Sequence, residues 1–443
     1  MQRILWMGFS VAVLVALVGA PSARAQNGQA IAFIGATVLP MDGARRLPNH
    51  TVIVRGDRIV EVGPAATVNV PDGAQRVEAS GKFIIPGLAE MHGHVPPPNA
   101  PQDFIDDVLF LYVANGITTV RGMLGAPGQL ELRAKANRGE VIAPTLYLAG
   151  PSFNGNSVST PEQAAQMVRE QKAAGWDLLK VHPGLTRDEF DAMARTAKEV
   201  GIRFGGHVPQ DVGLLHALEM GQETFDHLDG YMEYLNGGQG PIPVDRLRDV
   251  ARRTKAANAW VVPTMVLWET LMGIPEVEEL AAFPELRYMP PNTVTQWTNA
   301  HRNRLANPEM NRESGRTVAE NRKRLLDILQ EEGVGILMGT DAPQQFSVPG
   351  FSLHREMALM VDAGMTPHEV LTSGTLNVGR YFANADTFGT IVAGQRADLI
   401  LLDADPLTDV GNVAKSAGVM VRGRWLPRAE IDRRLEEMSE RRK

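Results

Sequence analysis

The chain has 443 residues, of which 44% are hydrophobic and 21% are charged. This length fits a barrel of about 250 residues with a companion domain, and the composition excludes a disordered or fibrous protein. The formal net charge is -7, and apart from a short tail at residues 441–443 no stretch is basic enough to follow a phosphate backbone, so nucleic acid is not an expected partner. The sequence has no cysteine, which excludes disulfides and leaves only nitrogen and oxygen donors for a bound metal.

The first 25 residues differ from the rest of the chain. Arg3 gives a positive start, residues 11–20 lie in an apolar run, and residues 23–25 suit a cleavage site. We expect residues 1–25 to be a signal peptide and the mature protein to be exported, either periplasmic or secreted. The alternative is an uncleaved membrane anchor, because the apolar stretch approaches the roughly 20 residues that a bilayer requires. No later segment is apolar enough, so we expect no stable membrane span after cleavage.

Short β segments separated by turns are predicted near both ends of the chain. They cover residues 32–38, 51–55, 58–62 and 76–78 near the N-terminus, and residues 397–403 and 418–422 near the C-terminus. Turns such as Gly56-Asp57 separate them. We therefore expect residues 26–85 and 386–443 to build one small β-sandwich domain together.

Between residues 86 and 385 short apolar runs alternate with amphipathic helical stretches. The apolar runs cover residues 118–121, 145–149, 178–181, 203–206, 261–266 and 335–338. Alternating β and α units imply a parallel sheet, and this many repeats suggest closure. The predicted fold class is therefore α/β, with a TIM-like (β/α)8 barrel beside the β-sandwich. An insertion around residues 270–320 is interrupted by prolines, and it is either a lid over the barrel mouth or a solvated surface excursion.

Histidines follow several predicted strands of this barrel. His92 and His94 come after the apolar run at residues 83–88, and their spacing of two sends both imidazoles to one face of an extended strand. His207 and His227 each end a short strand-like segment, and a helix is predicted between them. Catalytic groups in such barrels collect at the carboxyl ends of strands. These four histidines are therefore candidate site residues.

Two charged residues occupy comparable positions. Asp341 closes the apolar run that begins at residue 335, at the point where a strand gives way to a loop. Lys180 lies in the apolar run at residues 178–181, where a buried ammonium is costly unless it is paired or neutralised. The lysine either forms a salt bridge with a barrel carboxylate or has reacted with carbon dioxide to become a carbamate, an oxygen ligand able to bridge two cations.

In order along the chain, these motifs resemble the amidohydrolase superfamily, in particular its exported prolidase-like and imidazolonepropionase-like branch. The resemblance rests on residues 86–94 (PGLAEMHGH), Lys180, His207, His227, residues 339–343 (GTDAP) and the closing segment at residues 389–403. It spans almost the whole mature chain. Glu90 stands where aspartate is usual, and Arg121-Gly122 replaces a more common Arg-Asp pair. Neither departure removes a ligand.

The resemblance implies a binuclear metal site with zinc as the expected ion. The implied ligands are His92, His94 and Asp341 for the deeper metal, His207 and His227 for the outer metal, and carbamylated Lys180 bridging both. Prolidase-like members keep this lysine, whereas imidazolonepropionase-like members use one metal and lack it. The implied chemistry is attack of a metal-bridging hydroxide on a carbonyl carbon, with Asp341 as the catalytic residue that moves the proton to the leaving nitrogen.

Three further residues are candidates for contact with substrate. Tyr231 follows His227 in a βα loop and could bind a substrate carboxylate or simply pack the loop. His182, two residues after Lys180, could meet substrate or line the barrel top. Arg121 could be a counter-ion for substrate or pair with an internal carboxylate.

The leading hypothesis is a metal-dependent hydrolase that cleaves an amide or peptide bond, such as that of an Xaa-Pro dipeptide or an N-acyl amino acid. Its partners would be small molecules or short peptides. A second reading is a lactonase, an esterase or an aromatic-amide amidase of the ochratoxin type, since the same hydroxide serves those carbonyls. A third is a non-catalytic binding barrel. A homo-oligomer is left open by the sequence.

Overall fold

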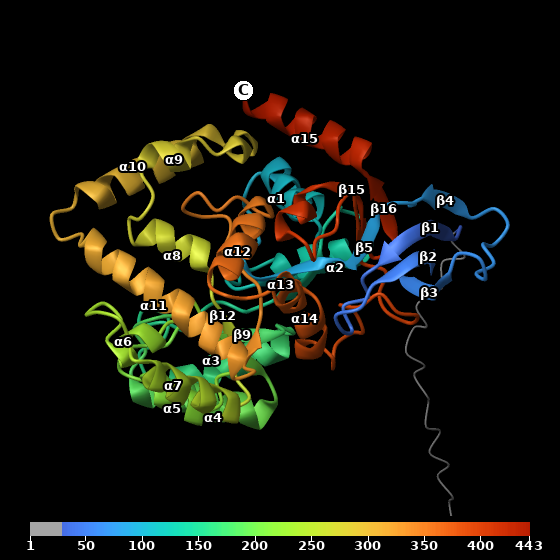
Figure 1. The fold of residues 1–443 in the computed structure, drawn as a ribbon. Helices are drawn as coiled ribbons and strands as arrows, with labels where there is room; N and C mark the ends of the chain where they lie inside the picture. Colours follow the sequence, from blue (N-terminus) through green and yellow to red (C-terminus); the bar gives the residue numbers. More distant parts are fainter. Residues whose placement is uncertain (1–28) are drawn as a thin grey trace, which may run out of the picture.

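The computed structural model describes residues 29–443 as an α/β protein (Figure 1). The signal peptide predicted at residues 1–25 lies outside the described residues and stays a prediction. Across residues 29–443, none of the helices combines the length and the apolar character needed to cross a membrane.

Strands from both ends of the chain form one eight-stranded mixed sheet, in the order β16-β15-β14-β5-β1-β2-β3 with β4 beside β1. Its strands are β1 (Ile31–Val38), β2 (Leu47–Arg55), β3 (Arg58–Pro64), β4 (Gln75–Glu78), β5 (Phe83–Pro86), β14 (Leu399–Leu402), β15 (Ser416–Val421) and β16 (Arg424–Pro427). The Gly56-Asp57 turn joins β2 to β3, and Gly56 has the positive φ of 60° that such a tight hairpin needs. Both chain ends thus share a sheet, while its division into two sandwich layers stays a prediction.

Two further sheets contain only parallel strands, in the orders β6-β7-β8 and β13-β12-β11-β10-β9. Their strands are β6 (Leu88–Gly93), β7 (Ile117–Gly122), β8 (Thr145–Leu148), β9 (Leu178–Val181), β10 (Arg203–Gly206), β11 (Thr224–Asp226), β12 (Trp260–Val262) and β13 (Gly335–Ile336). The predicted strands at residues 178–181 and 203–206 agree with β9 and β10 in both bounds.

Backbone hydrogen bonds also connect the edges of the two parallel sheets. Beyond β8, the N–H of Phe153 donates to the carbonyl of Lys180 in β9 at 2.8 Å. On the other side, the N–H of Met91 in β6 donates to the carbonyl of Met338 at 2.8 Å, and the N–H of Asp341 donates to the carbonyl of His92 at 2.6 Å. Backbone hydrogen bonds therefore link β9 to the segment after β8, and β6 to the segment after β13.

Amphipathic helices alternate with the parallel strands. They are α1 (Gln102–Ala114), α2 (Gln129–Asn137), α3 (Pro161–Ala174), α4 (Arg187–Val200), α5 (Leu214–Glu219), α6 (Tyr231–Leu235), α7 (Val244–Ala256), α11 (Arg312–Glu331), α12 (Phe351–Asp362), α13 (Pro367–Gly374) and α14 (Leu376–Tyr381). In α4 the Thr186 side chain and Glu189 form a capping box, while Phe190, Met193 and Ala197 are buried at helical spacing. Such helices cover the strands with their apolar faces.

The predicted strand at residues 261–266 is wrong in its second half. β12 ends at Val262, and α8 (Met265–Leu271) begins three residues later. Pro263 has no N–H to donate to a neighbouring strand, and Thr264 takes a left-handed φ of 46°, so the chain turns away from the sheet here. This turn places Thr264 next to the carboxyl end of β11.

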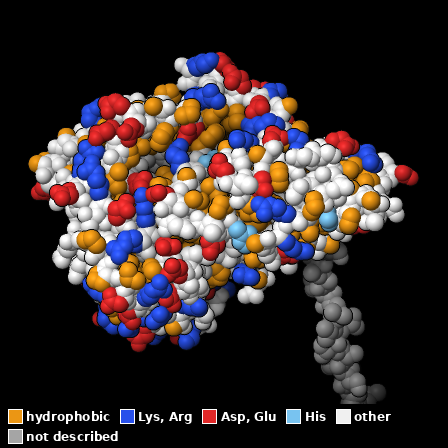
Figure 2. Space-filling model, viewed as in Figure 1, with side chains coloured by type: hydrophobic (Ala, Val, Ile, Leu, Met, Phe, Trp, Pro, Cys, Tyr) orange, Lys and Arg blue, Asp and Glu red, His pale blue; other side chains and the backbone are white. Residues whose placement is uncertain are grey.

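The segment predicted as an insertion around residues 270–320 folds as short helices. They are α9 (Val277–Ala281), η1 (Pro284–Tyr288) and α10 (Pro291–Ala306), and they precede α11. Pro284 and Pro291 occupy first helical positions, where a missing N–H costs nothing. The C-terminal helix α15 (Arg428–Arg442) follows a short helix η2 (Val410–Ala414) and strands β15 and β16, and it contacts η1. Figure 2 shows hydrophobic side chains gathered between the segment formed by α9, η1 and α10 and the helix α15.

Candidate metal centre

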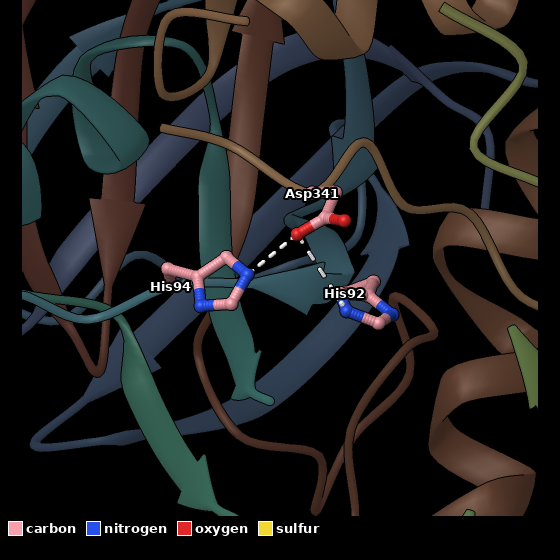
Figure 3. A group of neighbouring side chains, drawn as sticks. All are labelled: His92, His94 and Asp341. Atoms are coloured by element: carbon pink, nitrogen blue, oxygen red, sulfur yellow. Dashed lines mark hydrogen bonds and ion pairs between the residues drawn. The ribbon is translucent and has the colours of Figure 1, made fainter. Parts of the chain in front are cut away.

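Three side chains predicted as ligands of one metal lie close together at the end of β6 (Figure 3). One donor atom from each of His92, His94 and Asp341 lies within 4.8 Å of the other two. The Oδ1 atom of Asp341 is 2.5 Å from Nε2 of His94 and 3.6 Å from Nε2 of His92. The two histidines of the His-x-His motif therefore converge on one carboxylate, which is the arrangement that a divalent cation can share.

The buried carboxylate of Glu90 helps to hold this group in place. Its Oε1 atom accepts hydrogen bonds from the backbone N–H groups of His92, at 3.1 Å, and of Thr340, at 2.7 Å. Its Oε2 atom accepts from the Thr340 hydroxyl at 2.6 Å. Glu90 thus connects His92 of β6 to Thr340, the residue that precedes Asp341. The glutamate side chain is longer than the aspartate that is usual at this position, and it reaches both backbone segments.

Lys180 lies on β9 and is fully buried beside the same group. Its Nζ atom is 3.1 Å from Nε2 of His92. Burial lowers the pKa of Lys180 to about 8, while the carboxylates of Asp226 and Asp341 act in the opposite direction. A substantial fraction of this amine is therefore neutral near physiological pH, and a neutral amine is the form that can react with carbon dioxide.

His207 and His227 complete the predicted set. The ring centroids of His227 and His207 are 4.6 Å apart, and those of His227 and His92 are 4.4 Å apart. The Nδ1 atom of His227 hydrogen-bonds with Thr264 Oγ1 at 2.8 Å, and Nδ1 of His207 lies 2.5 Å from a carboxylate oxygen of Asp229. In both imidazoles Nε2 is therefore the nitrogen left for a further ligand. The Nε2 atom of His227 is buried, has no hydrogen-bond partner within residues 29–443 and is 3.6 Å from Asp341 Oδ2.

The protonation states suit cation binding. Burial lowers the pKa of His92 and of His227 well below the ordinary value, so both imidazoles are neutral with a free lone pair. Burial raises the pKa of Asp341, but its interactions with His92, His94 and Lys180 lower it more strongly, so the carboxylate is ionised. Nitrogen and oxygen donors of this kind fit a divalent ion such as zinc, and the orphaned Nε2 of His227 is the atom that a cation would satisfy.

Asp226 is a functional residue that the sequence reasoning missed. It lies at the end of β11, and its Oδ2 atom is 2.7 Å from Nδ1 of His92, although without hydrogen-bond geometry. Its carboxylate accepts hydrogen bonds from Nη2 of Arg121 at 3.1 Å. Burial raises the pKa of Asp226, but the charges of Arg121 and Lys180 bring it below the ordinary value. An acidic residue on an apolar strand directly before His227 is the signal that could have identified it.

Arg121 is fully buried, so the structure favours the internal-carboxylate alternative that the sequence left open. Tyr231 is likewise fully buried, and its hydroxyl hydrogen-bonds with Thr254 Oγ1 at 2.8 Å. Tyr231 therefore packs the loop against α7.

His182 is only partly buried and its ring stacks on His207 with 4.9 Å between centroids. Burial, together with the charge of Lys180, lowers the pKa of His182 to about 3, so the ring at the rim of the site is neutral.

Sequence comparison places the chain among known proteins. The chain is 21% identical over 401 residues to adenine deaminase 3 of Rhizobium meliloti (strain 1021), a match that covers 85% of this chain but only 56% of that relative. It is 22% identical over 390 residues to an imidazolonepropionase of Rhizobium rhizogenes, with coverage of 83% of this chain and 90% of the relative. The chain thus spans about half the length of the adenine deaminase and most of the imidazolonepropionase.

Solved structures give a consistent result. The bottromycin amidohydrolase superposes with a TM-score of 0.73 at 25% identity, covering 94% of this chain and 92% of that chain. An Xaa-Pro dipeptidase with bound methionine superposes with a TM-score of 0.68 at 18% identity, covering 90% of this chain and all of the other (100%).

The sequence model of the amidohydrolase family matches residues 83–426, a range that contains every strand and loop of the metal centre described above. The resemblance inferred from the motifs is confirmed at this level, as is the prediction of an amidohydrolase-type enzyme with prolidase and imidazolonepropionase neighbours. This chain belongs to the amidohydrolase family.

Proposed function

We propose that this protein is a metal-dependent hydrolase that cleaves an amide or peptide C–N bond. The observation that carries the proposal is the convergence of three imidazoles on one ionised, buried carboxylate. His92 and His94 approach Asp341 Oδ1, and His227 approaches Asp341 Oδ2. In a folded core such a cluster is costly without a cation, because the buried Nε2 atom of His227 finds no hydrogen-bond partner among the described residues.

The donor set supports two divalent ions, with zinc as the proposed metal. His92, His94 and Asp341 would hold one ion and His207 and His227 the other, with Lys180 contributing as its carbamate to both. When bound, the metal pair lowers the pKa of water and polarises a carbonyl group. The Nδ1 atom of His227 hydrogen-bonds with Thr264, and that of His207 hydrogen-bonds with Asp229. These bonds orient the two imidazoles so that Nε2 could bind a metal.

Asp341 is proposed as the residue that moves the proton. Its carboxylate is ionised and lies at the centre of the site, so it can accept a proton from the attacking water. The water oxygen bonds to the carbonyl carbon, the C–N bond breaks, and Asp341 delivers the proton to the departing nitrogen. The products are a carboxylic acid and an amine, and the aspartate returns to its ionised form.

We further propose that the two parallel sheets form one closed (β/α)8 barrel. The backbone hydrogen bonds from Phe153 to Lys180, from Met91 to Met338 and from Asp341 to His92 support this closure, since they bridge both pairs of sheet edges. In a closed barrel the ligands from β6, β9, β10, β11 and the segment after β13 would share the carboxyl-terminal mouth.

The proposed substrates are Xaa-Pro dipeptides or N-acyl amino acids. Support comes from the similarity to the bottromycin amidohydrolase and from the fold shared with an Xaa-Pro dipeptidase. Two relatives found by sequence comparison are named adenine deaminase and imidazolonepropionase, so the substrate panel also includes the compounds in these names.

The decisive experiment combines elemental analysis of the purified protein with hydrolysis assays before and after chelation. The panel contains Xaa-Pro dipeptides, N-acyl amino acids, a lactone, an aromatic amide, adenine and imidazolonepropionate. We expect about two zinc ions per chain and chelator-sensitive cleavage of an amide. Protein without bound metal, and without turnover after addition of zinc and bicarbonate, would refute the proposal in favour of a binding barrel.

A substitution tests the role of Asp341. Asp341→Asn removes the proton carrier, so we expect kcat to fall by about 100- to 10,000-fold. The control is Asp211→Asn, because Asp211 is exposed. Equal kcat in Asp341→Asn and the parent protein would exclude Asp341 as the residue that moves the proton.

A further inference from the structure

Arg322 is a buried arginine that contacts the backbone beside the metal centre. It lies on α11, the helix that follows the insertion, and only 2% of it is exposed. Nη1 donates to the carbonyl of His227 at 2.5 Å and Nη2 donates to the carbonyl of Pro263 at 2.8 Å. The guanidinium also lies over the ring of Trp268, at 5.0 Å from its centroid. One side chain therefore ties together the loops that follow β11 and β12.

The charge of Arg322 has no ion-pair partner among the described residues. The other two fully buried arginines differ in this respect, since Arg121 pairs with Asp226 and Arg396 pairs with Asp398. In Arg322 the Nε atom is buried and has no hydrogen-bond partner in the part of the chain that the structure describes. A buried, unpaired guanidinium is costly, and the two backbone carbonyls are the only described groups that its two terminal nitrogens bind.

The backbone at these two carbonyls is strained. His227 has a φ of 65°, Leu228 a φ of 54° and Thr264 a φ of 46°, all in the left-handed region that such residues avoid. Arg322 binds the carbonyl of His227 itself and the carbonyl of the residue before Thr264. The side chains of His227 and Thr264 in turn meet at 2.8 Å. Arg322 thus links the two loops through their backbone carbonyls. The side chains of His227 and Thr264 link the same two loops at the candidate metal centre.

We propose that Arg322 is a positioning residue for the outer metal site. By holding the strained backbone of His227 and the turn before Thr264, it directs the Nε2 atom of His227 toward Asp341. The role rests on the proposed metal-dependent function. It predicts a selective effect, because His92 lies on β6 with its N–H bonded to Glu90, and the two carbonyls that Arg322 binds belong to His227 and Pro263.

The test is competitive zinc titration against a chelator, which gives two successive dissociation constants. We expect Arg322→Met to raise the dissociation constant of the second zinc ion by about 10- to 100-fold and to leave that of the first ion unchanged. Thr264→Val, which removes the hydroxyl bound to His227, should also raise the dissociation constant of the second ion. Arg322→Lys can donate to one of the two carbonyls and should fall between the parent and Arg322→Met. Circular dichroism and urea unfolding establish that each variant is folded.

A purely structural role for Arg322 would lower overall stability and weaken both zinc constants together, which would overturn the inference. An unchanged second constant in folded Arg322→Met would also overturn it. If that variant does not fold, Arg322→Gln, which is shorter and neutral and cannot span both carbonyls, provides the same comparison. Failure of the parent protein to bind any zinc would instead refute the proposed function, so the two failures are distinguishable.

Discussion

Burial of Lys180 determines the protonation and the reactivity of its amine. This lysine is completely buried on β9, next to a neutral imidazole, and burial lowers the pKa of its amine to about 8. A neutral amine can attack carbon dioxide, whereas an ammonium cannot. The proposed carbamate would be an anion, which the proposed divalent cations would stabilise. The same burial that makes the protonated lysine costly therefore prepares it for this reaction.

The pH dependence of carbamate formation tests this account. With a pKa of about 8, the reactive neutral fraction is about one half at pH 8 and about nine-tenths at pH 9, and at lower pH it approaches a tenfold fall for each unit. At constant dissolved carbon dioxide, we expect the rate of label uptake by metal-free protein to follow that curve. NMR with isotopically labelled carbon dioxide measures it. Lys180→Met should take up no label at the site, whereas Lys172→Met, at an exposed lysine, should behave as the parent does. A rate independent of pH between 6 and 9 would contradict the assignment.

At the scale of elements, the metal centre depends on how β6 meets the segment after β13. Gly339 lies so close to β6 that an added Cβ would stand 2.8 Å from the backbone nitrogen of His92. Glu90 fills the space beside this contact and accepts the N–H groups of His92 and Thr340. Burial raises the pKa of Glu90 to about 8, opposed by the hydrogen bonds from Thr340, so much of this side chain is neutral at physiological pH.

Substitution of Glu90 should separate hydrogen bonding from charge. Glu90→Ala leaves two buried N–H groups without acceptors, so we expect the free energy of unfolding to fall by about 2–4 kcal/mol, with weaker zinc binding. Glu90→Gln keeps an acceptor oxygen and resembles the neutral acid, so its loss should stay under about 1 kcal/mol. Urea unfolding measures both, with exposed Glu61→Ala as the control. Equal losses in the alanine and glutamine variants would show that charge, and not the backbone contact, is what Glu90 supplies.

At the scale of the whole molecule, the mixed sheet is joined to the parallel strands by a buried arginine. Arg396 donates from Nε to Asp398 Oδ2 at 2.6 Å, from Nη1 to Asp386 Oδ2 at 2.9 Å, and from Nη2 to Thr119 Oγ1 of β7 at 2.7 Å. The segment that leads into β14 is therefore bonded directly to a strand that neighbours β6. Arg396 thus connects the C-terminal part of the mixed sheet to the parallel strands that carry the candidate metal centre.

Removal of this arginine should destabilise the whole protein. Arg396→Met leaves the buried carboxylate of Asp398 unpaired, so we expect the free energy of unfolding to fall by about 3–5 kcal/mol. Arg46→Met breaks an exposed pair with Asp405 and should cost less than about 1 kcal/mol. Urea denaturation of the two variants gives the comparison. A loss below about 1 kcal/mol in Arg396→Met would mean that the sheet and the parallel strands are not coupled through this residue.

The sequence by itself determined the order of elements and the positions of the ligand candidates. Hydrophobic periodicity is local, so β9 and β10 could be predicted to the residue, and Lys180 and His207 could be placed on or just after them. The spacing of His92 and His94 predicted a shared face, and both reach Asp341 in the structure. The family resemblance supplied the roles of these residues, and the structure shows that the residues meet.

The tertiary structure alone decided which groups support and orient the site. The partners Asp226, Thr264 and Arg322 belong to elements far from His92 in the chain, and no periodicity in the sequence marks their contacts. From the sequence, Tyr231 could either bind a substrate carboxylate or pack the loop. Its burial and its hydrogen bond with Thr254 in the structure favour the packing role. The physical reason is the same in each case: strand and helix formation depend on neighbours in sequence, whereas burial, ion pairing and pKa depend on which distant segments pack together.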